Sequence, residues 1–218
     1  NGDGYDDMVI GAGQTTYSAN GAAFVVFGSS APQNVDLSAI ALGNSIQGFM
    51  IAGLTSSYSI SLNIDHGDFN GDGLDDISIA GVESGNYIVY GRSNSTATVQ
   101  ISSLVTTANT NGLKVTSGVG LSNLGDLNGD GVQDWGSAFG MNYYHQWRDF
   151  VATYGVADAT SLTVNTSTAA LQLMESWGQR MGYNDFATYA DVNGDGYSDL
   201  VLRSTYSQDG YTTWAEVY

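Results

Sequence analysis

One short acidic pattern occurs four times in this chain, and it constrains the fold more than any other feature. The pattern is D-x-N-G-D-G-x-x-D, and complete copies begin at Asp68, Asp126 and Asp191. A fourth copy starts at Asn1 and lacks the first two positions. The asparagines of successive copies lie 58 to 69 residues apart. This period is too long for a solenoid repeat and is close to that of a propeller blade with long loops.

Each copy of the pattern has the residues of a calcium-binding loop. Side-chain oxygens lie at positions 1, 3, 5 and 9, and the position 7 carbonyl completes the set. Glycines at positions 4 and 6 let the backbone turn tightly around one centre. Six or seven hard oxygens suit Ca²⁺ better than Mg²⁺, which prefers a smaller octahedral shell, whereas zinc and copper favour His or Cys. The sequence predicts up to four Ca²⁺ sites, the first incomplete, with these ligands: Asn1, Asp3, Tyr5 and Asp7; Asp68, Asn70, Asp72, Leu74 and Asp76; Asp126, Asn128, Asp130, Val132 and Asp134; Asp191, Asn193, Asp195, Tyr197 and Asp199.

Two other interpretations of the pattern are less favoured. An EF-hand needs Glu at position 12 and flanking helices. Position 12 is Ile79, Ser137 or Leu202, and the flanks are short apolar runs. A turn that binds no metal would explain a single copy, because Asp, Asn and Gly favour turns. Four copies with the same spacing of oxygen ligands favour calcium loops between strands.

The charge of the chain follows from these loops. The chain has 22 acidic and 5 basic residues, a formal net charge of −17, and 13 of the acids lie in the four loops. Without metal, the carboxylates within each loop repel one another, so metal binding is expected to couple to folding. Nucleic acids and anionic membranes are unsuitable partners for such a chain, and no stretch is apolar enough to insert into a membrane. Such loops bind at extracellular calcium levels, with Kd on the order of 10⁻⁴–10⁻³ M, which predicts a secreted or cell-surface location.

Patterns of β-branched and aromatic residues predict an all-β fold with four antiparallel strands in each repeat. The predicted first strands are 58–66, 119–124 and 182–189, and the second strands are 8–10, 77–80 and 200–202. The third strands are 23–28, 87–91, 150–155 and 213–218, and the fourth strands are 34–37, 98–101 and 162–165. Helix is expected only at 38–42 and 168–174.

The run from Gly67 to Ile77, followed by Tyr87-Ile-Val-Tyr-Gly91, resembles an FG-GAP repeat of the integrin α-chain β-propeller. Val25-Val-Phe-Gly28 and Gly48-Phe-Met-Ile-Ala-Gly53 resemble that repeat's outer strand and its approach to the next blade. The resemblance covers nearly all of the chain, although Trp135 to Gly140 replaces the usual apolar run.

The resemblance implies a β-propeller of four-stranded antiparallel blades, of which this chain would hold about three and a half. The approximate blades are 1–56, 57–117, 118–180 and 181–218 of one partial propeller spanning 1–218. A propeller of this family usually has seven blades. The shortfall predicts that the chain is a fragment, or that another copy of the chain closes the ring.

Candidate ligand-binding residues lie in the linkers between second and third strands, which should emerge opposite the calcium loops. The candidates are Tyr143, Tyr144, His145, Trp147, Tyr206 and Tyr211. Aromatic rings beside amides suit a sugar face or a peptide anchor, although packing between blades would also use them. The leading hypothesis is an extracellular adhesion or recognition module that binds a glycan or a protein.

Two alternative functions remain open. FG-GAP-like propellers also occur in polysaccharide-degrading proteins, and an enzyme would need a cleft that gathers His145, Arg148 and Asp149. No hydrolase, metalloprotease or phosphate-loop motif is present, so an enzyme is not expected. A structural subunit of a surface layer or filament would instead use residues 143–147 to contact other copies of itself. Asn94 and Asn165 begin sequences that fit the N-glycosylation sequon.

Overall fold

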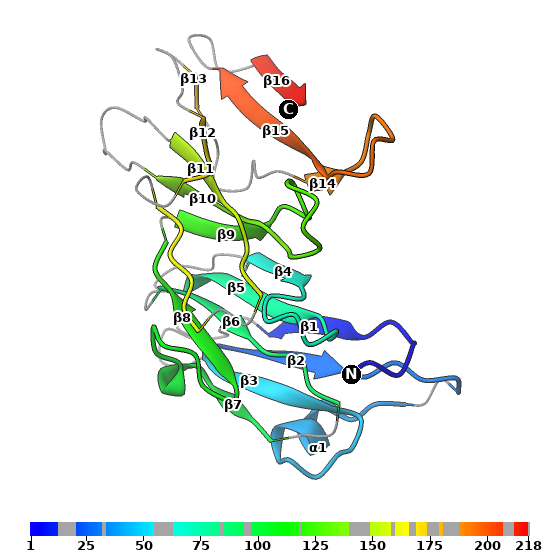
Figure 1. Cartoon of the computed structure of the whole chain (residues 1–218). Coiled ribbons are helices and arrows are strands. Elements are labelled where there is room, and N and C mark those ends of the chain that lie inside the picture. The colour runs from blue at the N-terminus through cyan, green and yellow to red at the C-terminus, as the bar shows by residue number, and fades with distance from the viewer. Residues whose placement is uncertain are drawn as a thin grey trace.

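The computed structural model describes residues 1–12, 21–31, 34–54, 63–82, 85–93, 97–117, 119–139, 149–157, 160–165, 169–173, 179–180, 188–206 and 212–217. These residues form four four-stranded sheets and two short helical segments, which confirms the all-β prediction. The sheets follow one another in chain order, from the N-terminal sheet at the bottom of Figure 1 to the C-terminal sheet at the top.

Each sheet is built mainly from one repeat. Sheet 1 contains β1 (Met8–Ala12), β2 (Gly21–Val26), β3 (Gly48–Leu54) and β7 (Val99–Gln100). Sheet 2 contains β4 (Asn63–Gly67), β5 (Asp76–Val82), β6 (Gly85–Val89) and β8 (Gly112–Val115). Sheet 3 contains β9 (Val119–Asn123), β10 (Trp135–Phe139), β11 (Asp149–Thr153) and β12 (Leu171–Leu173). Sheet 4 contains β13 (Gln179–Arg180), β14 (Thr188–Ala190), β15 (Asp199–Tyr206) and β16 (Thr212–Val217).

Each predicted first, second and third strand overlaps an observed strand, although β2, β6 and β11 end at 26, 89 and 153, two residues before the predicted ends. Trp135–Phe139 forms a second strand despite its unusual sequence. The predicted fourth strands are wrong. In sheets 1, 2 and 3 the strand that pairs with the third strand is β3, β8 and β12, respectively. The short helix expected at 38–42 is confirmed as α1 (Leu37–Ala41), which Asp36 caps by accepting from the Ser38 amide. The helix expected at 168–174 is wrong, because 171–173 pairs with β11.

Two of the segments predicted as fourth strands, 98–101 and 162–165, lie beside the preceding sheet. Strand β7, at 99–100, pairs in parallel with β3 of sheet 1, and the 3₁₀ helix η1 (Ile101–Ser103) follows it. Likewise Thr163 forms a parallel bridge with Thr116, which follows the last strand of sheet 2. The connection between the third and fourth strands of one repeat therefore ties that repeat to the sheet before it.

Three apolar layers fill the spaces between successive sheets. Phe49 and Ile79 lie in the layer between sheets 1 and 2. Phe69 and Trp135 lie between sheets 2 and 3, with their rings 6.1 Å apart and inclined at 67°. Leu200 of sheet 4 joins a smaller cluster on sheet 3. Sheets 2 and 3 are thus buried on both faces, so burial of apolar surface holds the four sheets in one row.

Candidate metal-binding loops

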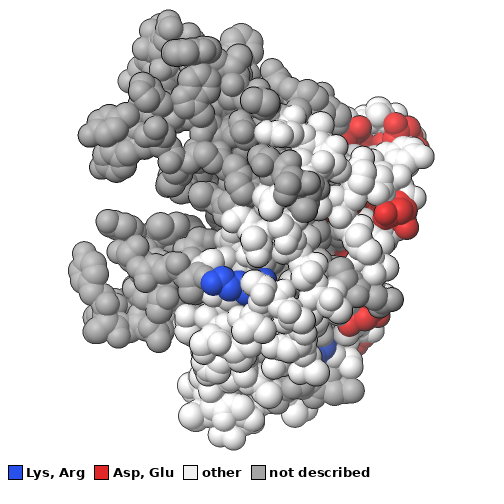
Figure 2. Space-filling model, turned by 60° about the vertical axis from the view of Figure 1, so that its left-hand side comes forward, with Lys and Arg blue, Asp and Glu red and all other residues white. Residues whose placement is uncertain are grey.

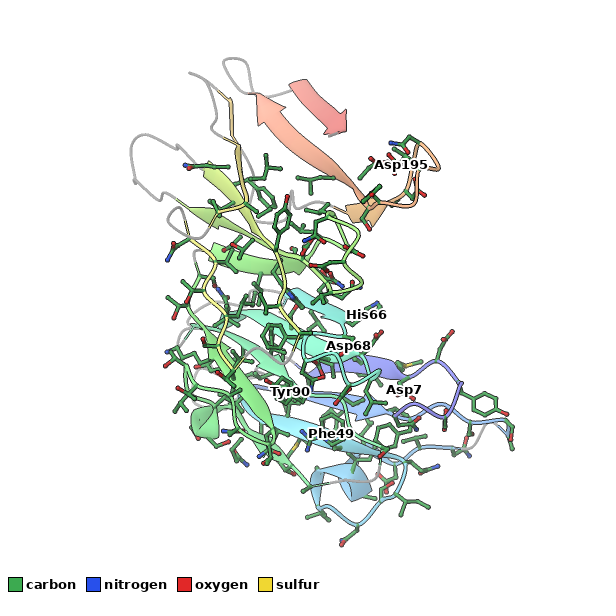
Figure 3. The ribbon with its side chains drawn as sticks, in the orientation of Figure 1. Asp7, Phe49, His66, Asp68, Tyr90 and Asp195 are labelled. Atoms are coloured by element: carbon green, nitrogen blue, oxygen red, sulfur yellow. The ribbon has the colours of Figure 1, made fainter. Side chains whose placement is uncertain are left out.

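The four acidic loops lie along one edge of the row of sheets. Three of them connect β4 to β5, β9 to β10 and β14 to β15, and the first precedes β1. Asp7, Asp68 and Asp195, which belong to three different sheets, lie on the same side of the molecule (Figure 3). Acidic side chains gather along one margin of the surface (Figure 2). The expectation that each complete loop joins the first two strands of its sheet is confirmed.

The first aspartate of each complete loop organises the turn. Asp68 Oδ1 accepts hydrogen bonds from the amides of Gly71 (2.8 Å) and Asp72 (3.1 Å), and Oδ2 accepts from Gly73 (2.8 Å). Both glycines have positive φ, 76° and 84°, which confirms the predicted tight turn. The same three bonds recur at Asp126 and at Asp191.

Positions 3 and 5 turn their oxygens toward the same loop. Asn70 Oδ1 accepts from the Asp72 amide (2.9 Å), and Asp72 Oδ1 accepts from the Leu74 amide (2.9 Å). Asn70 Nδ2 also donates to Asp72 Oδ2 at 3.1 Å, so these two side chains lie together. The first loop makes the same contacts between Asn1 and Asp3 despite lacking position 1.

The last loop aspartate has a different environment. Asp76 is fully buried, and its Oδ2 accepts from the amides of Phe69 (2.9 Å) and Asn70 (3.3 Å). Its Oδ1 accepts from the amide of Gly91 (2.8 Å), at the end of the third strand of the sheet. Burial raises the pKa of Asp76 to about 7, although the three amide donors oppose that rise. Asp76 therefore joins the loop to the sheet, in addition to its predicted role as a ligand.

This contact explains why a glycine follows an aromatic residue at the end of the third strand in three repeats. The amides of Gly28 and Gly155 each donate to the last loop aspartate at 2.8 Å, as Gly91 does. A Cβ at these glycines would lie 2.2 Å from Asp6 O, 2.6 Å from Asp75 O and 2.1 Å from Gln133 O. Only glycine fits there, because a backbone carbonyl fills the space. We name the contact between the last aspartate and this glycine the loop–strand lock.

Neighbouring loops are also joined to one another. The Ser198 amide donates to Asp126 O at 2.9 Å, and the Asp126 amide donates to Ser198 Oγ at 3.1 Å. Between sheets 2 and 3, Asn123 Nδ2 donates to His66 O at 2.6 Å. Nδ1 of the His66 ring lies 2.8 Å from Asp75 Oδ2 on the surface.

The donor chemistry of the loops fits a hard cation. Positions 1, 3 and 5 supply carboxylate and amide oxygens, and each of these side chains keeps at least one oxygen lone pair beyond its hydrogen bonds within the loop. Within the described residues, no three acidic, histidine or cysteine side chains converge as a metal-holding group. Each complete predicted set combines three aspartates with an asparagine oxygen and a backbone carbonyl, and it stays a prediction. Oxygen donors of this kind suit Ca²⁺.

The predicted ligand-binding residues fall mainly outside the described part of the chain. Residues 143–147 and 211 are among those not described. Tyr206 ends β15, and its side chain is also outside the description. The sequence did not predict the loop–strand lock. Its signal was present as an aromatic residue followed by glycine, namely Phe27-Gly28, Tyr90-Gly91 and Tyr154-Gly155.

Comparison with known proteins adds no assignment. No protein-family model and no curated protein sequence matches this chain. In the part of the chain that the structure describes, no helix has both the length and the apolar character needed to cross a bilayer.

The variant Asp76→Asn tests the loop–strand lock. At pH 8 it should lower the free energy of unfolding by about 2–3 kcal/mol, because an amide cannot accept from all three backbone donors. The loss should appear both in Ca²⁺ and in EDTA, since the hydrogen bonds are internal to the protein. Denaturant unfolding measures it. Equal stability of the variant and the parent in EDTA would contradict the lock.

Proposed function

We propose that this chain is a calcium-stabilised segment of an extracellular β-propeller of the FG-GAP type, and that it acts as an adhesion or recognition module. Each ion would neutralise the carboxylates of one loop and hold the hairpin between the first two strands. The recognised partner would be a glycan or an extracellular protein. The proposal places calcium in a structural role and recognition elsewhere on the molecule.

One observation carries the proposal: loops with the same oxygen pattern lie at the same edge of successive sheets and adopt the same internal hydrogen bonds. Asp68, Asp126 and Asp191 each accept from three loop amides. A single turn of this kind could form without any ligand. Repetition of the full set, with the carboxylates at positions 1 and 5 at least partly exposed, supports a cation at each loop.

The calcium requirement supports the proposed location. The loops hold 13 of the 22 acids of the chain. Their mutual repulsion is relieved only where Ca²⁺ is abundant relative to a Kd on the order of 10⁻⁴–10⁻³ M. Extracellular fluid meets that condition, whereas the cytosol does not.

The opposite edge of the sheets is the proposed recognition surface. Strands β5 and β6, and likewise β10 and β11, are antiparallel, so their connections emerge away from the calcium loops. The aromatic candidates at 143–147 lie in the second of these connections. A glycan and matrix-protein array, probed in Ca²⁺ and in EDTA, tests recognition. Binding that persists in a Trp147→Ala and Tyr144→Ala double variant would contradict this surface.

The variant Asp72→Asn tests the calcium assignment, with Asp75→Asn as its matched control. Both changes remove one charge from the same loop, but only Asp72 is a predicted ligand. Asp72→Asn should reduce the number of bound Ca²⁺ ions by one in isothermal titration calorimetry. It should also remove about 1.4–2.7 kcal/mol of stabilisation at about 10 mM Ca²⁺. Asp75→Asn should retain every ion, because its carboxylate contacts the exposed ring of His66.

The comparison in EDTA separates metal binding from repulsion. Without Ca²⁺, removing either charge should leave stability equal to the parent's or slightly higher, since the acids of the loop repel one another. If Asp72→Asn binds as many ions as Asp75→Asn, the assigned ligand set is wrong.

A further inference from the structure

Successive acidic loops contact one another as well as their own sheets. In chain order we call them loop 1 (residues 1–7), loop 2 (68–76), loop 3 (126–134) and loop 4 (191–199). They follow one another along one edge of the molecule (Figure 3). The contacts between loops 3 and 4 are the most extensive, and they involve residues that are, or directly adjoin, predicted calcium ligands.

Two hydrogen bonds join position 1 of loop 3 to position 8 of loop 4. The Ser198 amide donates to Asp126 O at 2.9 Å, and Ser198 Oγ accepts from the Asp126 amide at 3.1 Å. Asp126 is a predicted ligand, and its carboxylate organises the turn of loop 3. Ser198 stands between Tyr197 and Asp199, the last two predicted ligands of loop 4. The two bonds therefore fix the backbone of one site's ligand relative to the backbone of two ligands of the next site.

A ring contact adds to these hydrogen bonds. A Cβ at Gly129, position 4 of loop 3, would lie 2.4 Å from Tyr197 Cε1 and 3.0 Å from Cδ1. The ring at position 7 of loop 4 therefore packs directly on the turn of loop 3. Loops 1 and 2 repeat the arrangement, because Leu74 Cδ2 would lie 2.6 Å from a Cβ at Gly2. Position 7 thus contacts the preceding turn with its side chain, while its carbonyl belongs to the predicted ligand set of its own loop.

Loops 2 and 3 are joined by a side-chain contact instead. Gln133, position 8 of loop 3, accepts at Oε1 from Asn123 Nδ2 (3.0 Å), which also donates to His66 O (2.6 Å). A Cβ at Gly67 would lie 3.4 Å from Gln133 Cγ. Position 8 of loop 3 therefore lies close to the residues just before Asp68, as Ser198 lies against Asp126 in the next pair of loops.

We propose that the calcium sites of loops 3 and 4 are coupled, so that an ion in one loop raises the affinity of the other. The inference rests on the proposed calcium role of the loops and concerns the regulation of those same sites. An ion in loop 4 would order residues 197–199, and Ser198 then holds the backbone of Asp126. With its position 1 already held, loop 3 binds an ion at a smaller cost in conformational entropy. Linkage makes the effect reciprocal.

Repulsion between the bound ions would couple the sites with the opposite sign. An ion in loop 4 repels an ion that enters loop 3 and so lowers its affinity. Packed sheets lie about 10 Å apart, whereas the Debye length at 0.15 M salt is about 8 Å. Repulsion between exposed ions in successive loops is therefore largely screened, and the ordering of Asp126 should determine the sign of the coupling.

A site-resolved calcium titration by NMR measures the coupling. In the ¹⁵N-labelled chain at about 0.15 M NaCl, the amides of Gly129 and Gly131 report on loop 3, and those of Gly71 and Gly73 on loop 2. Asp195→Asn removes a predicted ligand from loop 4 alone, and the amides of loop 4 show whether its site is empty. The variant should raise the Ca²⁺ Kd of loop 3 at least about fivefold. The Kd of loop 2, one sheet further away, should change less than about twofold.

The variant Ser198→Ala tests whether the serine transmits the coupling. It removes the hydroxyl that accepts from the Asp126 amide and keeps every predicted ligand. In the Ser198→Ala background, Asp195→Asn should therefore raise the Kd of loop 3 by a smaller factor than in the parent chain. Ser102→Ala, at an exposed position of η1, is the matched control and should leave that factor unchanged.

The possible failures separate the coupling from the calcium role itself. Loop amides that do not respond to Ca²⁺ would reject both. Binding at loop 3 with the same Kd in Asp195→Asn and in the parent chain would reject the coupling and leave the calcium role intact. A lower Kd in the variant would show that ion repulsion prevails, which also overturns the proposal. A factor that Ser198→Ala leaves unchanged would exclude the serine as the link. Retained amide dispersion at saturating Ca²⁺ confirms the fold of each variant.

Discussion

Removal of calcium with EDTA is expected to lower the thermal midpoint of unfolding by at least about 8 °C. A site with Kd between 10⁻⁴ and 10⁻³ M contributes about 1.4–2.7 kcal/mol at about 10 mM Ca²⁺. Three complete loops together contribute about 4–8 kcal/mol. In a chain of this length each kcal/mol corresponds to about 2–4 °C. Differential scanning calorimetry in Ca²⁺ and in EDTA measures the difference.

Two controls isolate calcium as the cause. Added NaCl screens the loop carboxylates without filling their sites, so it should restore only a small part of the lost stability. Mg²⁺ at the same concentration should restore less than Ca²⁺, because it retains its waters and requires a smaller octahedral shell. A midpoint that is the same in EDTA and in Ca²⁺ would contradict the structural role of the ions.

Local patterns in the sequence were sufficient for most of the fold. The apolar run at 77–80 and the aromatic-rich run at 87–91 predicted two neighbouring strands, and the loop before them predicted the hairpin. Strands and loops depend on residues that are close in sequence, so one sequence is enough to predict them. The glycines of the loops predicted the backbone conformation for the same reason.

The fourth strands depended on information that local patterns do not contain. Residues 98–101 have the composition of a strand, and Val99–Gln100 is one, but its partner is β3 of another repeat. Residues 112–115, which form the true fourth strand of sheet 2, are a run of four with one β-branched residue and no aromatic residue, so their composition did not mark them as a strand. Which sheet a short extended segment joins is decided by tertiary packing.

The candidate site was predicted in part. Oxygen spacing identified positions 1, 3 and 5 of the loops, whose turn geometry agrees with the prediction. It also assigned Asp76 only as a ligand, whereas Asp76 also bonds the amide of Gly91. These two residues are brought together by the pairing of two strands, and no local pattern contains that distance.

Replacing the lock glycine of sheet 3 is expected to have the second large effect. In Gly155→Ala the new Cβ would lie 2.1 Å from Gln133 O and 2.8 Å from Val132 Cγ1. Backbone must move to relieve this overlap, and the movement lengthens the bond from the Gly155 amide to Asp134. Overpacking and the loss of a charge-assisted hydrogen bond together should cost about 3–5 kcal/mol. Chemical denaturation, with unchanged dependence on denaturant, measures this loss.

Gly11→Ala is the matched control for the lock glycine. Gly11 lies in β1, where an added Cβ has no heavy atom within 4 Å and φ lies outside the left-handed region. The same substitution there should be neutral or stabilise by about 0.4–1 kcal/mol, because alanine restricts the unfolded chain. A large loss at Gly155 with none at Gly11 assigns the effect to the contact with the loop carbonyl. Equal effects at the two positions would show that loss of glycine itself, rather than the lock, determines stability.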